Sequence, residues 1–345
     1  VFIPLMNIGN GNFRYAPEYE ASFENCDCRQ EGTFIDYNKD CIAELFCISG
    51  GGNRFRVYQG FQACEDSISF FLSDTLLFAE NTFNGNLDLI SMSKGDVSAI
   101  DIIATQVGFN RLTWYRNVSM DLYGNCDTLI FEKGTTCWGH FNEFNANDSL
   151  NLADTTSFAC QIQQRPDPSS TTRHAGTTLM LIDHNADSLM DILIGDVGTN
   201  RSNLAISSGP VEDPIMTDAI YAYPGNADSI LVWSYVANYY VDLNQDGVRD
   251  IASVPKNSDP SLIDYETGLS WLENTGADNL PIWQARGRTF MVNDHIDAGS
   301  NSSPAFVDYN SDGKMDLMVG NFVSNFLVGD TIRGKTELHL YENIG

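Results

Sequence analysis

Residues 306–320 read FVDYNSDGKMDLMVG, and the prediction of the fold rests on this segment. Apolar runs flank the nine residues 308–316, in which alternate positions carry oxygen-bearing side chains. Calcium takes six to eight hard oxygen ligands in a flexible shell, and Gly313, at the sixth place, permits the tight bend that such a loop needs. The segment is therefore predicted to be a calcium loop between two strands. Its predicted ligands, at places 1, 3, 5, 7 and 9, are Asp308, Asn310, Asp312, the carbonyl of Lys314, and Asp316.

The same pattern recurs elsewhere, so internal repetition is the main feature of the sequence. Full copies lie at 242–250, 183–191 and 36–44, and a worn copy lies at 80–88. A single loop of this kind could be an ordinary Asp/Asn turn, but the repeated pattern favours about three to five structural calcium ions. The further predicted ligands, with a backbone carbonyl at the seventh place of each full copy, are Asp242, Asn244, Asp246, Val248 and Asp250; Asp183, Asn185, Asp187, Leu189 and Asp191; Asp36, Asn38, Asp40, Ile42 and Glu44; and Glu80, Thr82, Asn84, Asn86 and Asp88.

The first six places of these loops resemble an EF-hand. An EF-hand also needs a bidentate acid at its twelfth place and an exiting helix. Here the twelfth residue is Cys47, Ile194, Ser253 or Val319, and a β-like apolar run follows each loop. The EF-hand interpretation is therefore excluded.

A second repeated element follows several loops: an apolar or aromatic strand that ends in Asn. It reads LYENIG at 340–345, WLENTG at 271–276 and WYRN at 114–117. The chain opens with the end of such a unit at 5–9. In a closed ring, this first strand could complete the blade begun by the last segment, which would remove exposed strand edges.

The spacing of the loops predicts the architecture. Loops start at 36, 80, 183, 242 and 308, and most spacings fit one four-stranded blade of about 40–50 residues with its loops. We expect an all-β fold, a single β-propeller domain over 1–345 with about six or seven blades, seven favoured. Residues 119–175 break the pattern and are interpreted as a degenerate or decorated blade, with a separately inserted module as the alternative.

Charge narrows the range of partners. The chain has 19 Lys and Arg against 46 Asp and Glu, a formal net charge of −27. A polyanionic surface repels phosphate backbones and anionic membranes, so we expect no nucleic-acid partner. No apolar run approaches the roughly 20 residues of a membrane helix, so no membrane insertion is expected. The chain has neither an initial Met nor a basic-then-apolar leader, which is expected of a mature or excised segment.

The eight cysteines all lie in the first half of the chain, and none forms a CxxC pair. Several disulfides in an oxidising compartment are the preferred interpretation, although the pairing cannot be read from sequence. A zinc site is the alternative, but the pair Cys26 and Cys28 lacks a matching second pair.

The loops and the Asn-terminated strands resemble the FG-GAP or VCBS repeats of calcium-binding β-propellers, as in integrin α-subunit heads and secreted bacterial proteins. The style is also similar to that of secreted Bacteroidota cargo of the type 9 system. The resemblance implies a secreted or cell-surface protein whose propeller binds a protein or glycan, mediates adhesion, or scaffolds neighbouring domains or subunits.

Motifs that would mark an enzyme are missing from the sequence. It contains no HExxH pair, no GxSxG elbow and no phosphate-binding glycine loop. The predicted function is therefore a non-catalytic binding module or scaffold, and no catalytic residue is predicted. The alternative is a propeller-type polysaccharide lyase or glycoside hydrolase, which would need acids on opposite sides of a cleft.

Overall fold

The computed structural model describes residues 4–23, 26, 32–38, 40, 42–49, 54–64, 67–77, 87–91, 100–105, 112–125, 128–144, 149–153, 177–196, 199–225, 230, 232, 235–255, 269–290, 303–311, 314–320, 324–328, 331–335 and 338–342. Strands dominate this part of the chain, and its helical structure is confined to the 3-10 helix η1 (Pro17–Phe23) and the short α1 (Ser119–Tyr123). The predicted all-β class is confirmed. None of the described helices is long and apolar enough to cross a membrane.

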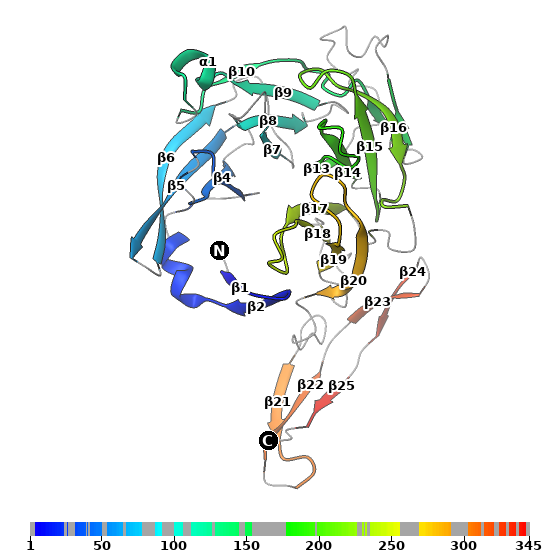
Figure 1. The fold of residues 1–345 in the computed structure, drawn as a ribbon. Helices are drawn as coiled ribbons and strands as arrows, with labels where there is room; N and C mark the ends of the chain where they lie inside the picture. Colours follow the sequence, from blue (N-terminus) through cyan, green and yellow to red (C-terminus); the bar gives the residue numbers. More distant parts are fainter. Residues whose placement is uncertain are drawn as a thin grey trace, which may run out of the picture.

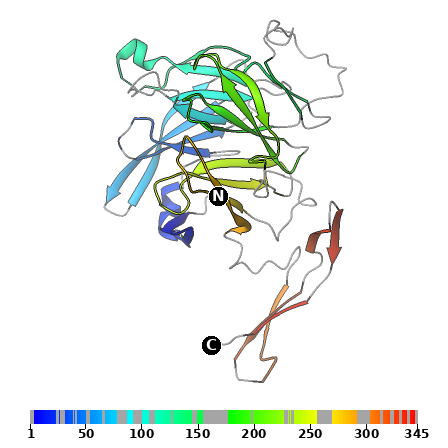
Figure 2. The ribbon, with the colours of Figure 1, turned by 45° about the vertical axis from the view of Figure 1, so that its right-hand side comes forward.

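Four sheets share one architecture, with four antiparallel strands in sequence order. Their strands are β3 (Gly32–Ile35), β4 (Glu44–Ser49), β5 (Arg54–Cys64) and β6 (Ser67–Leu77); β7 (Leu87–Ser91), β8 (Ile100–Thr105), β9 (Leu112–Asn117) and β10 (Phe131–Lys133); β13 (Thr177–Ile182), β14 (Asp191–Asp196), β15 (Ser202–Ser208) and β16 (Ile215–Ile220); and β17 (Val236–Val241), β18 (Asp250–Pro255), β19 (Leu269–Asn274) and β20 (Trp283–Phe290). This connectivity is that of propeller blades, and Figures 1 and 2 show the four sheets arranged around a common centre. The predicted β-propeller is confirmed, and its count of six or seven blades stays a prediction.

The remaining strands form smaller sheets. β1 (Leu5–Gly9) pairs with β2 (Asn12–Tyr15), β11 (Asn142–Phe144) pairs with β12 (Ser149–Asn151), and β23 (Ser324–Val328) pairs with β24 (Thr331–Lys335). A three-stranded sheet contains β21 (Ser303–Val307), β22 (Asp316–Gly320) and β25 (Leu338–Tyr341). In both views β21–β25 lie apart from the ring of four sheets (Figures 1 and 2).

The expectation that the first strand completes the last sheet is not met. β1 pairs with β2, and β22 pairs with β25 on the side opposite β21. In the described part of the chain, the place beside β22 is taken by β25, the third strand of that unit. The N-terminal hairpin β1–β2 instead lies, together with η1, between the sheet of β3–β6 and the sheet of β17–β20 (Figure 1).

The hydrophobic core lies between neighbouring blades. Buried clusters join β4 and β5 to β8 and β9, β8 and β9 to β13–β16, and β13–β15 to β17–β19. The sheets of β13–β16 and β17–β20 approach each other closely at Gly195, where an added Cβ would lie 2.1 Å from the carbonyl oxygen of Val236. The Thr178 hydroxyl donates to that same carbonyl. Each of these sheets is therefore held in place by its neighbours.

Residues 119–175 contribute to the ring in the part that is described. β10 is the fourth strand of the second blade. Trp138, only 1% exposed, belongs to the cluster between the second and third blades. Cys137 in this region and Cys47 in β4 are disulfide-bonded, whereas Cys26 has a free thiol whose pKa is raised by burial.

Candidate metal centre

Each of the four full loops connects the first strand of a sheet to the second. The last residue of the first strand pairs directly with the ninth residue of the loop in all four copies, so the loops share one register. These pairs are Ile35 with Glu44, Ile182 with Asp191, Val241 with Asp250, and Val307 with Asp316. The predicted strand–loop–strand placement of these four copies is what the structure shows.

The loop at 242–250 is curled by its own side chains. Asp242 Oδ2 accepts the backbone N–H of Gly247 at 2.9 Å, and Asn244 Oδ1 accepts that of Asp246 at 3.0 Å. Asp246 Oδ1 in turn accepts the N–H of Val248 at 2.8 Å. Gly247 lies at φ +88°, a conformation that glycine adopts without strain. The side chains at places 1, 3 and 5 therefore face one another across the loop and bend the backbone around a single point.

The loop at 183–191 repeats these contacts. Asp187 N–H donates to Asn185 Oδ1 at 3.1 Å, and Leu189 N–H donates to Asp187 Oδ1 at 2.8 Å. Ser188 takes the place of the glycine at φ +66°, and its N–H donates to Asp183 Oδ2 at 3.1 Å. The bend is thus retained without glycine.

The loop at 36–44 follows the same plan. Asp40 N–H donates to Asn38 Oδ1 at 3.0 Å, and Ile42 N–H donates to Asp40 Oδ1 at 2.8 Å. Asp36 Oδ1 also accepts the N–H of Asp40, at 3.1 Å. Three loops with different sequences therefore share one internal geometry.

The ninth residue is a buried acid that ties the loop to its sheet. Glu44, Asp191, Asp250 and Asp316 are all 0% exposed. Each accepts the backbone N–H of the second residue of its own loop, at 3.0–3.3 Å. In two blades the second carboxylate oxygen accepts a third-strand N–H at 2.8 Å, from Ser207 to Asp191 and from Asn274 to Asp250.

Burial of these acids raises their pKa values. The pKa of Asp191 is raised to about 6 and that of Glu44 to about 7, in both cases mainly because burial disfavours the charged form. Nearby loop carboxylates raise both values further. Ionisation of these acids is therefore disfavoured in the folded chain, and a bound cation would favour their charged form.

The donor set at places 1, 3 and 5 fits calcium. Asp183 Oδ1 is buried and has no hydrogen-bond partner among the described residues, which is the arrangement expected of an oxygen that faces a cation. In three loops the Asn amide nitrogen instead donates to the fifth-place carboxylate, at 2.9–3.1 Å. Among the described residues, no group of three or more carboxylate, imidazole or thiol side chains lies close enough together to hold a metal ion. The hard-oxygen donors that would hold calcium are the side chains at places 1, 3 and 5 and the carbonyl at place 7, and the ligand role of the ninth-place acid stays a prediction.

Some predicted ligands are placed differently or are not described. Asp312, Glu80, Thr82, Asn84 and Asn86 lie outside the described residues. Asp88 lies inside β7, the first strand of its sheet, so it precedes the connection from β7 to β8.

Sequence reasoning missed Asp101, which is the counterpart of the ninth loop residue in the second blade. Its Oδ1 accepts the N–H of Asn117 on the third strand at 2.7 Å, and its Oδ2 accepts from the Trp114 indole at 3.1 Å. Burial raises the pKa of Asp101 to about 6. The signal was present in the sequence, because Asp followed by Ile occurs at 101, 191 and 250 alike.

The 242–250 loop also holds the N-terminal hairpin. Asn7 Nδ2 donates to the carbonyl of Leu243 at 3.0 Å, and the N–H of Asn10 donates to the carbonyl of Asn244 at 3.0 Å. Gln245 Nε2 donates back to the carbonyl of Asn7 at 3.3 Å. The loop that most resembles a calcium loop thus joins chain segments that are more than 230 residues apart.

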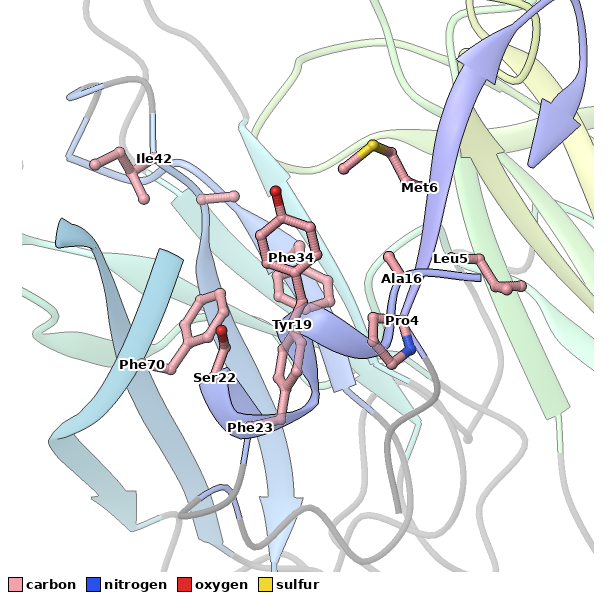
Figure 3. Close-up of a pocket in the computed structure, with 11 residues that line it drawn as sticks. Pro4, Leu5, Met6, Ala16, Tyr19, Ser22, Phe23, Phe34, Ile42 and Phe70 are labelled. Carbon is pink, nitrogen blue, oxygen red and sulfur yellow. The ribbon is translucent and has the colours of Figure 1, made fainter. Parts of the chain in front are cut away.

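An apolar pocket of about 370 Å³ lies on the other side of the hairpin, between β1, η1 and the first blade (Figure 3). Its wall includes Phe23, which stacks on Phe70 at 5.1 Å between ring centroids, and Phe34, at 5.8 Å from Phe70. Tyr19 also lines the pocket, as does Ile42, the seventh residue of the first loop. A pocket of this size and lining is typical of a site for a small apolar group.

One comparison with known proteins, a match to a family model, agrees with the repeat. The model of the FG-GAP-like repeat family matches residues 242–319, which include the loops at 242 and 308. A solved structure of a lectin from Agrocybe aegerita, described as specifically recognising non-reducing terminal N-acetylglucosamine, is 13% identical; the match covers 89% of this chain and 79% of that chain, with a TM-score of 0.32. No curated protein matches the sequence.

Proposed function

This chain is a β-propeller that carries an FG-GAP-like repeat, and from that premise we propose that it is a non-catalytic, calcium-stabilised binding module that works outside the cell. Its partner is a protein or glycan, or a neighbouring domain or subunit that it holds in place. The observation that carries the proposal is the repeated loop: three blades curl the same side chains in the same way around one point.

Compartment and charge support the proposal. Calcium sites of moderate affinity fill where the free ion is abundant, as it is outside cells. The disulfide-bonded Cys47 and Cys137 fit an oxidising compartment. Divalent ions would also offset part of the formal charge of −27. Ion binding to the folded state alone raises stability by mass action.

The apolar pocket is the candidate ligand site. Its aromatic wall can pack against the apolar face of a sugar ring or against an apolar side chain of a protein. Because Ile42 belongs to both the pocket and the first loop, calcium would fix the wall on that side. We therefore expect ligand binding to depend on calcium.

The test is a binding screen with the purified chain. The chain is applied to a glycan array and used to capture extracellular proteins, each with calcium and with chelator. A Phe34→Ser variant serves to locate the site, because Phe34 is half exposed and lines the pocket. We expect calcium-dependent binding that Phe34→Ser weakens while the fold is retained. Turnover of a polysaccharide, abolished by one point mutation without unfolding, would overturn the non-catalytic assignment.

A further inference from the structure

Two glutamates that lie outside the predicted calcium loops form hydrogen bonds with residues of those loops. Glu273 Oε1 accepts Asn244 Nδ2 at 3.1 Å, and Glu342 Oε1 accepts Asn310 Nδ2 at 3.0 Å. Glu273 lies in β19 and Glu342 directly follows β25, so each Glu is at the third strand of the same sheet, and the Asn is the third residue of the loop. Two sheets built from different residues therefore bring one extra carboxylate to the same place in the loop.

Strand register explains the recurrence. Ile251 lies opposite Leu272 and Leu317 lies opposite Tyr341, so the next residue along each third strand lies beside the ninth loop residue. The same position can be read in every sheet that has this register, from the pairs Leu45–Tyr58, Ile102–Tyr115 and Ile192–Ala205. The residues at this position are Glu273, Glu342, Gln59, Arg116 and Ile206.

The identity of this residue differs with the sequence of the loop beside it. Glu occurs beside the two loops that have glycine at the sixth place, 242–250 and 308–316. A neutral residue occurs beside the loops at 183 and 36. Arg116 occurs in the second blade, where the corresponding connection, 92–99, contains one acid and one lysine. Arg116 pairs with Asp121 at 2.6 Å. The positively charged side chain of Arg116 thus belongs to the blade whose connection is least suited to bind a metal cation.

We propose that this third-strand position sets the cation affinity of each loop. Glu273 and Glu342 each add a carboxylate to the calcium site, Gln59 and Ile206 leave the loop to its own ligands, and Arg116 marks a blade without calcium. The inference rests on the proposed calcium function and deepens it. Added carboxylate charge tightens calcium sites, and Glu273 is well placed to act, because its side chain is 14% exposed and Arg286 holds its other oxygen.

The test measures calcium binding to the whole chain by isothermal titration calorimetry after chelation and dialysis. Glu273→Gln keeps the shape of the side chain and removes its charge. We expect it to weaken one site by about 10–100-fold, the range typical of groups that support metal ligands. Ile206→Glu adds the missing carboxylate beside the 183–191 loop and should tighten that site. Asp218→Asn is the matched control, because it removes an exposed strand carboxylate whose hydrogen bond within the described part of the chain is to the adjacent Ala219 N–H.

The outcomes separate the inference from the function. Wild-type affinities in both Glu273→Gln and Ile206→Glu, with calcium still bound by the wild type, would overturn the inference and leave the proposed function intact. Absence of calcium binding in the wild type would overturn both. If Glu273→Gln does not fold, Ile206→Glu decides alone, because unchanged affinity there contradicts the role of the position and tighter binding supports it.

Discussion

Asp250 and Asp246 belong to the same loop, yet we expect their replacement to lower the stability of the fold under different conditions. Asp250 is 0% exposed and accepts the backbone N–H groups of Leu243 at 3.2 Å and Asn274 at 2.8 Å. Asp246 lies in the exposed part of the loop and accepts the N–H of Val248. The ninth residue should therefore support the fold without calcium, whereas the fifth should matter only when calcium is bound.

The magnitude follows from the groups left unpaired. Asp250→Ala leaves two buried N–H groups without an acceptor, and each costs about 1–3 kcal/mol, so the loss is about 2–6 kcal/mol in all. Burial raises the pKa of Asp250, so removing the buried charge returns part of this free energy, and the net loss falls in the lower half of the range. Asp246→Ala returns two donors to water, the N–H of Val248 and the side-chain amide of Asn244, and such surface changes lie within about 0.5 kcal/mol.

The assay is urea unfolding followed by tryptophan fluorescence, first in chelator and then in saturating calcium. In chelator, Asp250→Ala should lower the free energy of unfolding by at least about 2 kcal/mol, and Asp246→Ala should leave it unchanged. In calcium, Asp246→Ala should lose the stabilisation that the wild type gains. Equal losses for the two variants in chelator would refute the distinction between a framework acid and an ion ligand.

Three further predictions concern the ring and its acids. Gly195→Ala would place a Cβ 2.1 Å from the carbonyl oxygen of Val236 in the next blade; we expect a loss of about 1–3 kcal/mol, measured by calorimetry, and an unchanged melting temperature would contradict the close contact. Asn7→Ala removes the hydrogen bond to the carbonyl of Leu243 and should cost about 1 kcal/mol while exposing the N-terminal hairpin to limited proteolysis; protease resistance equal to that of the wild type would count against the docking. Asp101 has a pKa raised by burial to about 6, so the stability it contributes is present below about pH 4 and is lost as the pH rises through about 6, roughly 3 kcal/mol in total. In chelator, Asp101→Asn should therefore make the melting temperature fall less than that of the wild type between pH 4 and pH 7, and parallel curves for the two proteins would show that Asp101 is not the titrating group.

Much of the fold could be predicted from the sequence, because the deciding patterns are local. The apolar flanks and alternating oxygen side chains of 308–316 imply a strand, a tight loop and a strand, and the structure has β21, the loop and β22 in that order. The structural role of the ninth residue could not be predicted. It depends on a third-strand N–H, from Asn274 in one blade and from Ser207 in another, and no short-range pattern reveals that contact.

The packing of the N-terminal hairpin against distant parts of the chain also could not be predicted from the sequence. The contact between Asn7 and Leu243 spans 236 positions, and the apolar pocket needs the hairpin, η1 and β6 together. The worn copy at 80–88 shows the opposite problem, because a local resemblance pointed to a segment whose last residue, Asp88, lies within β7. The acid that occupies the ninth place in that blade is Asp101 in β8, and the connection before it lacks the rest of the pattern.

The most direct measurement is differential scanning calorimetry of the chelated chain as calcium is added back, with magnesium at equal ionic strength as the control. The account predicts that calcium raises the melting temperature in a saturable way and that magnesium does so far less, since magnesium dehydrates reluctantly and demands a stricter geometry. A melting temperature that does not move with calcium would mean that these loops are turns and nothing more.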